Sequence, residues 1–175
     1  MIPREIETER LRLRQFTEPD VKAMARLNGM PEVTQYMGHG VMDYDDTWRQ
    51  IAAVLGQWQM RGYGPYAVDD KASGKFIGRI GPYYPSDWPA FEVGWLIDPA
   101  FWGHGLATEG AKAAVDCVFQ HMDLDRICAV IHPDNPKSIR VAKKLGESYL
   151  GETPIRGASA LLYGITRERW KVSRR

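Results

Sequence analysis

The chain has 175 residues, of which 44% are hydrophobic and 26% are charged. This size and composition are typical of one globular domain, which excludes a disordered chain and predicts a single domain over residues 1–175. The formal net charge is only +1, so we expect no nucleic-acid partner. The sequence has a polar start and no uninterrupted apolar run of about 18 residues, which favours a cytoplasmic protein without a membrane span.

The first half of the chain predicts a strand, two helices and then further strands. Residues 8–14 alternate leucine with arginine, the period of a half-buried strand. We expect Thr17 to cap a first helix, and a second helix to begin at the carboxylates of residues 43–46 and end near Gly62. Strands are predicted over residues 66–68, 75–80 and 91–97, the first two of them joined as a hairpin.

The second half alternates helices with strands. Apolar residues at helical spacing predict a helix over residues 107–122, and a second one over residues 136–145 that opens at Asn135. Short apolar runs predict strands over residues 126–131 and 160–166. Hairpins followed by a strand–helix–strand unit predict an α/β fold, with a mixed and mostly antiparallel sheet flanked by helices.

The most informative stretch is residues 92–116, in which a strand, a glycine-rich loop and a long helix follow one another. Gly103 and Gly105 allow a close approach of the backbone to a ligand. The first turn of the helix offers unpaired N–H groups, which suit a phosphate, although many glycine-rich turns bind nothing. The spacing excludes a Walker loop, and Thr108 fits the third position of a dinucleotide fingerprint poorly.

The segment WGHGLATE, residues 102–109, resembles the cofactor loop of the Gcn5-related N-acetyltransferase (GNAT) superfamily, with the pattern Q/R-x-x-G-x-G/A. Gly105, Leu106 and Ala107 match its last three positions, and Trp102 replaces the first, as is common in the RimJ/RimL-type branch. Other segments resemble the opening strand, the fourth strand, the Asn-x-x-Ser helix and the closing strand of that branch: residues 8–14, 92–98, 132–146 and 163–170. The resemblance implies the acyl-CoA N-acyltransferase fold, with about seven strands and about four helices.

The resemblance also implies an activity, the transfer of an acetyl group from acetyl-CoA to a primary amine by direct attack in a ternary complex. The acceptor would be a protein N-terminal α-amine or a small-molecule amine. The superfamily holds acetyl-CoA in a gap between two parallel strands. The residues expected there are Leu96 and Ile97 through their backbone, and Trp102, Gly103, His104, Gly105, Leu106, Ala107, Thr108, Asn135 and Ser138.

Two side chains are candidates for proton transfer under this resemblance. Ser138 would protonate the leaving thiolate, because Ala142 stands where most of the superfamily has a tyrosine. Glu92 would act as the base through water, with a solvent-facing strand residue as the alternative. A base is needed because a lysine amine, with an ordinary pKa of about 10.4, is almost fully protonated at pH 7.

The acceptor site is expected between residues 30–42 and the loop at residues 83–88. Its candidate liners are aromatic: Tyr36, Tyr83, Tyr84 and Trp88. Alternatively, these rings simply cover the sheet or form a dimer contact. The four histidines show no metal-ligand spacing and neither cysteine has a histidine partner, so no metal and no activated nucleophile are expected.

An alternative from a different class is a non-catalytic CoA-binding sensor or interaction module, which Ala142 favours. Glu147 is a second departure, because the family usually has an aromatic residue after Lys-Leu-Gly. The sequence leaves open whether the protein is a monomer or a homodimer.

Overall fold

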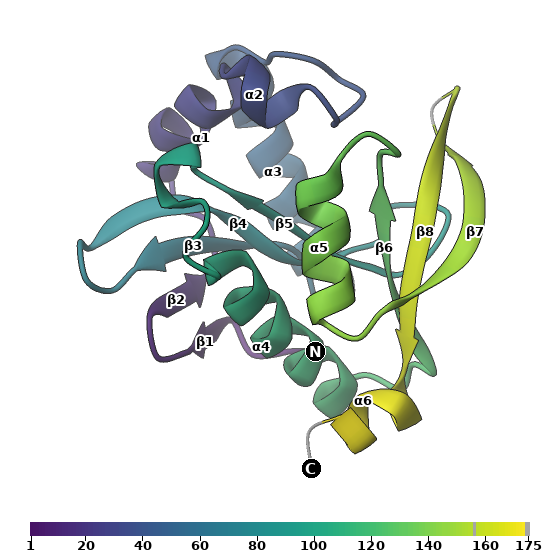
Figure 1. Ribbon diagram of the computed structural model, residues 1–175. Helices are drawn as coiled ribbons and strands as arrows, with labels where there is room; N and C mark the ends of the chain where they lie inside the picture. Colours follow the sequence, from purple (N-terminus) through teal and green to yellow (C-terminus); the bar gives the residue numbers. More distant parts are fainter. Residues whose placement is uncertain (156, 174–175) are drawn as a thin grey trace.

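The computed structural model of the protein describes residues 1–155 and 157–173. Figure 1 shows one mixed sheet whose eight described strands run in the order β1-β2-β3-β4-β5-β6-β8-β7. The strands are β1 (Glu5–Glu7), β2 (Leu11–Arg14), β3 (Tyr66–Asp70), β4 (Lys75–Tyr83), β5 (Glu92–Ile97), β6 (Arg126–Ile131), β7 (Ser148–Ile155) and β8 (Ala158–Thr166). The helices are α1 (Asp20–Asn28), α2 (Pro31–Thr34), α3 (Tyr44–Arg61), α4 (Leu106–His121), α5 (Pro136–Lys144) and α6 (Arg167–Ser173), with a short 3-10 turn, η1, at Pro99–Phe101.

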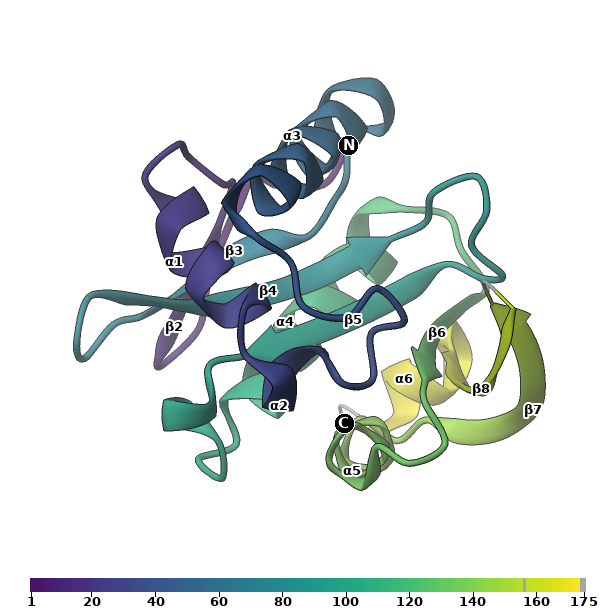
Figure 2. The same ribbon diagram turned by 90° about the horizontal axis from the view of Figure 1, so that it is seen from above.

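The helices form two layers around the sheet. Helices α1 and α3 lie on one face and α4 and α5 on the other, as Figure 2 shows from above. The short helix α2 and the loop after it lie at the end of the sheet seen at the top of Figure 1. Mixed topology with helices on both faces confirms the expected α/β fold. None of the helices in the described part of the chain is long and apolar enough to cross a membrane.

The parallel strands β5 and β6 separate soon after they meet. Their register contains one pair, Glu92 opposite Cys128, and the Cys128 amide donates to the carbonyl of Phe91 at 2.9 Å. On its other edge β6 pairs along its whole length with β8, from Arg126 to Ile131. The sheet therefore opens between β5 and β6 while the strands on either side stay paired, which leaves a gap with backbone edges facing each other.

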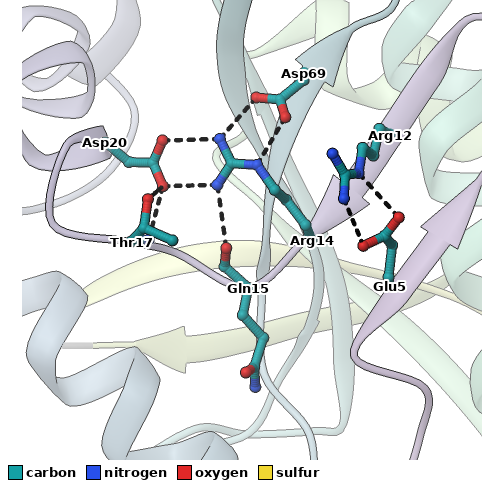
Figure 3. A network of polar contacts seen from close by, with 7 residues as sticks. All are labelled: Glu5, Arg12, Arg14, Gln15, Thr17, Asp20 and Asp69. Carbon is teal, nitrogen blue, oxygen red and sulfur yellow. Dashed lines mark hydrogen bonds and ion pairs between the residues drawn. The ribbon is translucent and has the colours of Figure 1, made fainter.

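A polar network centred on Arg14 joins β2 to the first helix and to the neighbouring strand of the sheet (Figure 3). The guanidinium of Arg14 donates to both carboxylate oxygens of Asp20 at 2.7 and 2.9 Å and to both of Asp69 at 2.7 and 2.9 Å. These contacts connect β2 to the start of α1 and to β3. Asp20 is buried, so its charge is compensated where water cannot reach it. The contacts hold the pKa of Asp20 below its ordinary value against the opposing effect of burial.

Several local expectations are confirmed. The side chain of Asp43 caps α3 by accepting from the Asp46 amide at 2.8 Å, and Gly62 ends that helix in the left-handed conformation. Asn135 caps α5 in the same manner by accepting from the Ser138 amide. These positions depend only on neighbouring residues, which is why the sequence predicts them.

Two expectations are wrong in detail. Residues 8–14 do not form one strand, because Thr8 makes a turn with Leu11 that separates β1 from β2. Thr17 does not cap α1; it donates to Asp20 instead. The strand predicted over residues 160–166 does end at Thr166, and the last four residues of the segment likened to the family's closing strand begin α6. The chain accordingly has eight described strands and six described helices instead of seven and four.

Candidate functional site

A cavity of about 1360 Å³ runs through the gap between β5 and β6. One wall consists of β5, the loop after η1, the first turn of α4 and the first two turns of α5. The opposite wall consists of α2, the loop that follows it and one side of α3. Because the cavity passes between the strands, two molecules that enter from opposite faces of the sheet can meet inside it.

The glycine-rich loop forms one end of the cavity. Gly103 and Gly105 have positive φ angles of 82° and 77°, which an L side chain adopts only with strain. Gly105 begins α4 without a side-chain hydrogen bond to the helix, so the amides of the first turn remain available to a ligand. Glycine is thus required by the backbone here, and the exposed amides suit an anion.

Contacts with other elements of the structure hold this loop in place. Arg10 donates to the carbonyl of His104 at 2.9 Å and to the Glu109 carboxylate at 2.6 Å. The indole of Trp102 donates to the carbonyl of Ile97 at 2.6 Å. Lys137 of α5 places its Nζ 3.7 Å from the centroid of the Trp102 ring, a cation–π contact that joins the loop to α5.

Most of the residues predicted for the cofactor line the cavity. They are Leu96, Ile97, Trp102, Gly103, Gly105, Leu106, Ala107, Thr108, Asn135 and Ser138. His104 does not line it; its ring is exposed, with Nδ1 3.4 Å from the carbonyl of Phe101. Three basic side chains of α5 also line this end: Lys137, Arg140 and Lys144. Helix amides, glycines and lysines together fit a ligand that carries phosphate groups.

Ser138 lies where α5 faces the gap. Its half-buried hydroxyl accepts a hydrogen bond from the Trp95 indole at 3.3 Å. An indole N–H can only donate, so the hydroxyl proton of Ser138 is not used in this contact and can be donated elsewhere. The structure therefore places a hydroxyl donor of α5 on the cavity wall, within hydrogen-bond distance of Trp95 of β5.

Glu92 lies at the closed end of the gap and is buried. The indole of Trp88 donates to its Oε2 at 2.5 Å. Burial raises the pKa of Glu92 to about 7, and the hydrogen bonds from Trp88 and the Val130 backbone and the charge of Arg79 oppose this rise. A carboxyl group with a pKa near neutrality can both accept and release a proton at physiological pH.

The aromatic residues predicted for the acceptor site fall into two groups. Tyr36, Tyr83 and Trp88 line the cavity. The rings of Tyr83 and Trp88 meet edge to face, with centroids 5.0 Å apart. Tyr84 is not among the lining residues: its ring packs against Phe91 at 5.9 Å and its carbonyl accepts from Arg61.

Arg79 and Lys137 are among the lining residues that were not predicted from the sequence. Arg79 lies on β4 opposite Leu96 of β5, and Lys137 contacts Trp102. Arg79 can be seen in the sequence as an arginine within an apolar strand. Which face of the sheet its side chain lies on, however, depends on how β4 pairs with β5. The partner of Lys137 depends on how the loop folds.

The described residues offer little support for other chemistries. No group of three or more His, Cys, Asp or Glu side chains among them is arranged to hold a metal ion. Both cysteines are buried, and burial raises the pKa of Cys117 and brings that of Cys128 to about 11, which disfavours the reactive thiolate.

Comparison with known proteins agrees with this geometry. The Acetyltransferase (GNAT) domain family matches residues 10–147. The chain is 33% identical to the uncharacterized protein YkkB of Bacillus subtilis, over 81% of this chain and 84% of that protein. It is 30% identical to the uncharacterized N-acetyltransferase YnaD of the same organism, over 81% of each chain.

Solved structures show the same fold. An acetyltransferase from Agrobacterium tumefaciens is 30% identical, with a TM-score of 0.85 over 95% of this chain and 96% of that one. The ribosomal-protein acetyltransferase RimL, solved with coenzyme A, is 20% identical, with a TM-score of 0.76 over 94% of this chain and 97% of that one. The match to the family covers well over half of the chain, and the sheet opens where a cofactor loop meets a helix. The chain belongs to the GNAT family of N-acetyltransferases, which take their acetyl group from acetyl-CoA.

Proposed function

We propose that the protein transfers an acetyl group from acetyl-CoA to a primary amine by direct attack, with both substrates bound in this cavity. The observation that carries the proposal is the separation of β5 from β6 after the pair Glu92–Cys128, with the cavity passing through the gap. A cofactor reaching the gap past the glycine loop and an acceptor reaching it past α2 and α3 would be held in one reactive geometry, so no covalent enzyme intermediate is required.

The cofactor side would be formed by the glycine loop and the facing backbone edges. The amides of residues 102–108 would bind the pyrophosphate, with Lys137 adding positive charge at the same end. Backbone groups of Leu96 and Ile97 would bind the pantetheine arm and polarise the carbonyl that is attacked. Bound there, acetyl-CoA supplies an acetyl thioester, the carbonyl group that an amine attacks.

Glu92 would remove the proton of the attacking amine. Its carboxyl lines the cavity, and Gly94 next to it on the same strand has no side chain to cover it. A pKa of about 7 leaves a large fraction of Glu92 ionised at neutral pH while keeping it basic enough to accept a proton, directly or through a water molecule.

Ser138 would supply the proton that the departing thiolate needs. Its hydroxyl lies on the cofactor side of the gap, and the Trp95 indole fixes its orientation without using its proton. Ala142, which is buried one turn further along α5, offers no competing group. The two proton transfers are thus assigned to different elements, β5 and α5.

The relatives leave two classes of acceptor. The solved neighbours include RimL, which acts on a protein α-amine, and an aminoglycoside acetyltransferase, 20% identical with a TM-score of 0.80. Spermidine N(1)-acetyltransferase of Escherichia coli is 39% identical over 57 residues, 33% of this chain. We propose an amine acceptor of either class, with its polar group close to Tyr83 and Trp88.

The proposal is tested by measuring thiol release from acetyl-CoA with N-terminal peptides, amino acids, aminoglycosides and polyamines as acceptors. Release above the rate without acceptor, together with an acetylated amine in the mass spectrum, is the expected result. Tight binding of acetyl-CoA without acetylation of any amine would contradict the proposal and favour a non-catalytic CoA-binding module. Failure to bind acetyl-CoA would contradict the role given to the glycine loop.

A further inference from the structure

The acceptor side of the cavity contains the guanidinium of Arg79, whose buried Nε has no hydrogen-bond partner among the described residues. Resting on the proposed function, we infer that the acceptor is an amine that also carries a carboxylate, such as a free amino acid, and that Arg79 binds this carboxylate. The inference concerns the substrate class and adds a residue outside the cofactor site.

Strand register places Arg79 on the face of the sheet that borders the acceptor side of the cavity. In the antiparallel pairing of β4 with β5, Arg79 lies opposite Leu96 and Tyr83 lies opposite Glu92. Directly opposed residues share a face of the sheet, so Arg79 lies on the same face as Glu92. Ile80, the next residue, points to the other face, where it would contact any side chain added at Gly110 of α4. Arg79 therefore faces α1 and α3, the side from which the acceptor would enter.

The guanidinium of Arg79 has no bound counterion within the described chain. Its Nε is buried without a hydrogen-bond partner among the described residues, while Arg14, Arg26 and Arg167 all donate to oxygen atoms. Glu92 acts on it as a nearby charge and not as a bonded partner. Burial lowers the pKa of Arg79, which is the cost of removing its charge from water. A carboxylate in the cavity would satisfy the unpartnered donor and offset this cost.

The surface of the sheet between Arg79 and Glu92 is open to the cavity. Gly94 lies between Glu92 and Leu96 on β5 and lines the cavity without a side chain. A Cβ at this position would lie 3.2 Å from Oε1 of Glu92, so the glycine keeps the carboxyl accessible. An amine near Glu92 and a carboxylate at Arg79 would be the two ends of one small molecule, with its side chain against Tyr36, Tyr83 and Trp88.

The charges on the acceptor side of the cavity form no acidic patch that would attract a polycation. Apart from the α5 side chains at the cofactor end, the charged lining residues are three basic and three acidic ones: Arg49, Arg61 and Arg79, and Glu32, Asp46 and Glu92. Of the three acids, Asp46 is paired with Arg49 at 2.8 Å, and Glu92 is partly protonated at neutral pH because of its raised pKa. Spermidine would bring positive charges next to Arg79 without an acidic patch to receive them.

The test compares matched acceptors in the wild type and in Arg79→Met. Phenylalanine and phenylalaninamide, with leucine and leucinamide as a second pair, differ only in the carboxylate. The ratio of kcat/KM for acid over amide is compared between proteins, because that comparison cancels the different pKa values of the two amines. We expect Arg79→Met to lower this ratio by about 10- to 100-fold, Arg79→Lys to lower it less, and spermidine to be a poor acceptor of the wild type.

Arg49→Met is the matched control, since Arg49 also lines the cavity but is 68% exposed and paired with Asp46. It should leave the ratio within about twofold of the wild type. An unchanged ratio in Arg79→Met, or an equal fall for acid and amide, would overturn the inference, the second result indicating a structural role. Acetylation of neutral amines or spermidine but of neither amino acid would overturn it as well.

A binding measurement separates this inference from the proposed function. If no amine is acetylated, the transfer proposal fails, and calorimetry with N-acetylphenylalanine and its amide then tests the anion site alone. In protein saturated with CoA, the carboxylate compound should bind about tenfold more tightly than the amide, with the difference lost in Arg79→Met. Equal affinities of the two compounds for the wild type would overturn the inference.

Discussion

Glu92 of β5 lies opposite Cys128 of β6 at the point where these two parallel strands begin to separate. Strand pairing holds the backbone of Glu92, and the Trp88 indole holds its carboxyl. The residue is therefore fixed by the sheet at the closed end of the gap, although its carboxyl faces the cavity. The same strand carries Gly94 and Leu96 further into the gap, so the proposed base, the uncovered position beside it and the backbone proposed to contact the cofactor all come from β5.

The first prediction concerns the base. Glu92→Gln should lower kcat/KM by about 10²- to 10⁴-fold. Since Glu92 must be ionised to accept a proton, the wild-type rate should rise with pH through an apparent pKa of about 7. The variant should keep only the dependence that comes from the acceptor amine. Trp88→Phe is the control. It removes a hydrogen bond that lowers the pKa of Glu92, so in this variant the rise of the rate with pH should shift to higher pH. A rise of the rate near pH 7 that persists in Glu92→Gln would exclude Glu92 as the base.

The second prediction concerns the acid. Ser138→Ala should lower kcat by about tenfold or more while the KM for acetyl-CoA changes little, because the hydroxyl is needed when the thiolate departs. Ser138→Thr keeps a hydroxyl and should retain most of the rate. Equal rates for the wild type and Ser138→Ala at saturating substrates would show that water protonates the thiolate instead.

The third prediction separates backbone strain from ligand binding. Gly105 begins α4 with φ at 77°, and Gly74 in the β3–β4 hairpin has φ at 67° with nothing within 4 Å of an added Cβ. Alanine at either position should cost about 1–2 kcal/mol of stability. Only Gly105→Ala should also raise the KM for acetyl-CoA, because it disturbs the amides of the cofactor loop. Urea unfolding and initial-rate measurements on both variants test this, and a similar rise of KM in Gly74→Ala would contradict it.

The fourth prediction concerns the polar network of Figure 3. Arg14→Met should lower the free energy of unfolding by about 1–3 kcal/mol, because it leaves the buried Asp20 without its cation. The pKa of Asp20 is lowered from 3.8 in the folded protein, so this contribution is present at neutral pH and is lost as the pH falls below that value.

Arg12→Met provides the comparison for this network. Arg12 pairs with Glu5 in the neighbouring strand, and both side chains are nearly half exposed, at 48% and 45%. Its thermal midpoint should stay close to that of the wild type. Equal losses in Arg14→Met and Arg12→Met would contradict the importance given to the burial of Asp20.

The fifth prediction concerns Glu147, whose two carboxylate oxygens are buried without partners among the described residues. Burial, followed by the charge of Glu92, raises its pKa to about 8. The folded protein then holds a proton that the unfolded chain releases above its ordinary value of 4.5, so this residue makes stability fall as the pH rises from about 5 to 8.

Glu147→Gln should remove this dependence without changing the volume of the side chain. The variant should match the wild type near pH 5 and exceed it by about 1–3 kcal/mol near pH 8. Chemical unfolding at both pH values measures the difference. A constant difference between the two proteins across this range would mean that Glu147 does not titrate in it.

The features that could be predicted from the sequence are those determined by neighbouring residues. Gly103 and Gly105 indicate an anion-binding loop because the conformations they allow are local, and Asp43 and Asn135 cap helices by bonding to amides three residues ahead. Most strands and helices likewise follow from the hydrophobic period of the sequence, but the strand β7 and the short helices α2 and α6 were not predicted. For these reasons the fold class and the position of the glycine-rich loop are predictable from the sequence.

The acceptor end depends on contacts between distant segments, which the sequence does not reveal. Tyr83 and Tyr84 are adjacent and look equivalent, yet only the first lines the cavity. Arg79 becomes a candidate residue only once β4 is paired with β5. Similarly, α6 was not predicted, and Arg167 at its start donates to carbonyls near the end of α4 and just after it, contacts that depend on how distant segments pack.

Direct transfer between two substrates held in one cavity is tested most directly by initial-rate kinetics in which both substrate concentrations are varied. Direct transfer predicts intersecting lines in double-reciprocal plots, no acetylated form of the enzyme in the mass spectrum, and no CoA release beyond the hydrolysis rate without an acceptor. Parallel lines together with an acetyl group trapped on the protein would contradict it, because they would show that the acetyl group reaches the amine through a covalent intermediate.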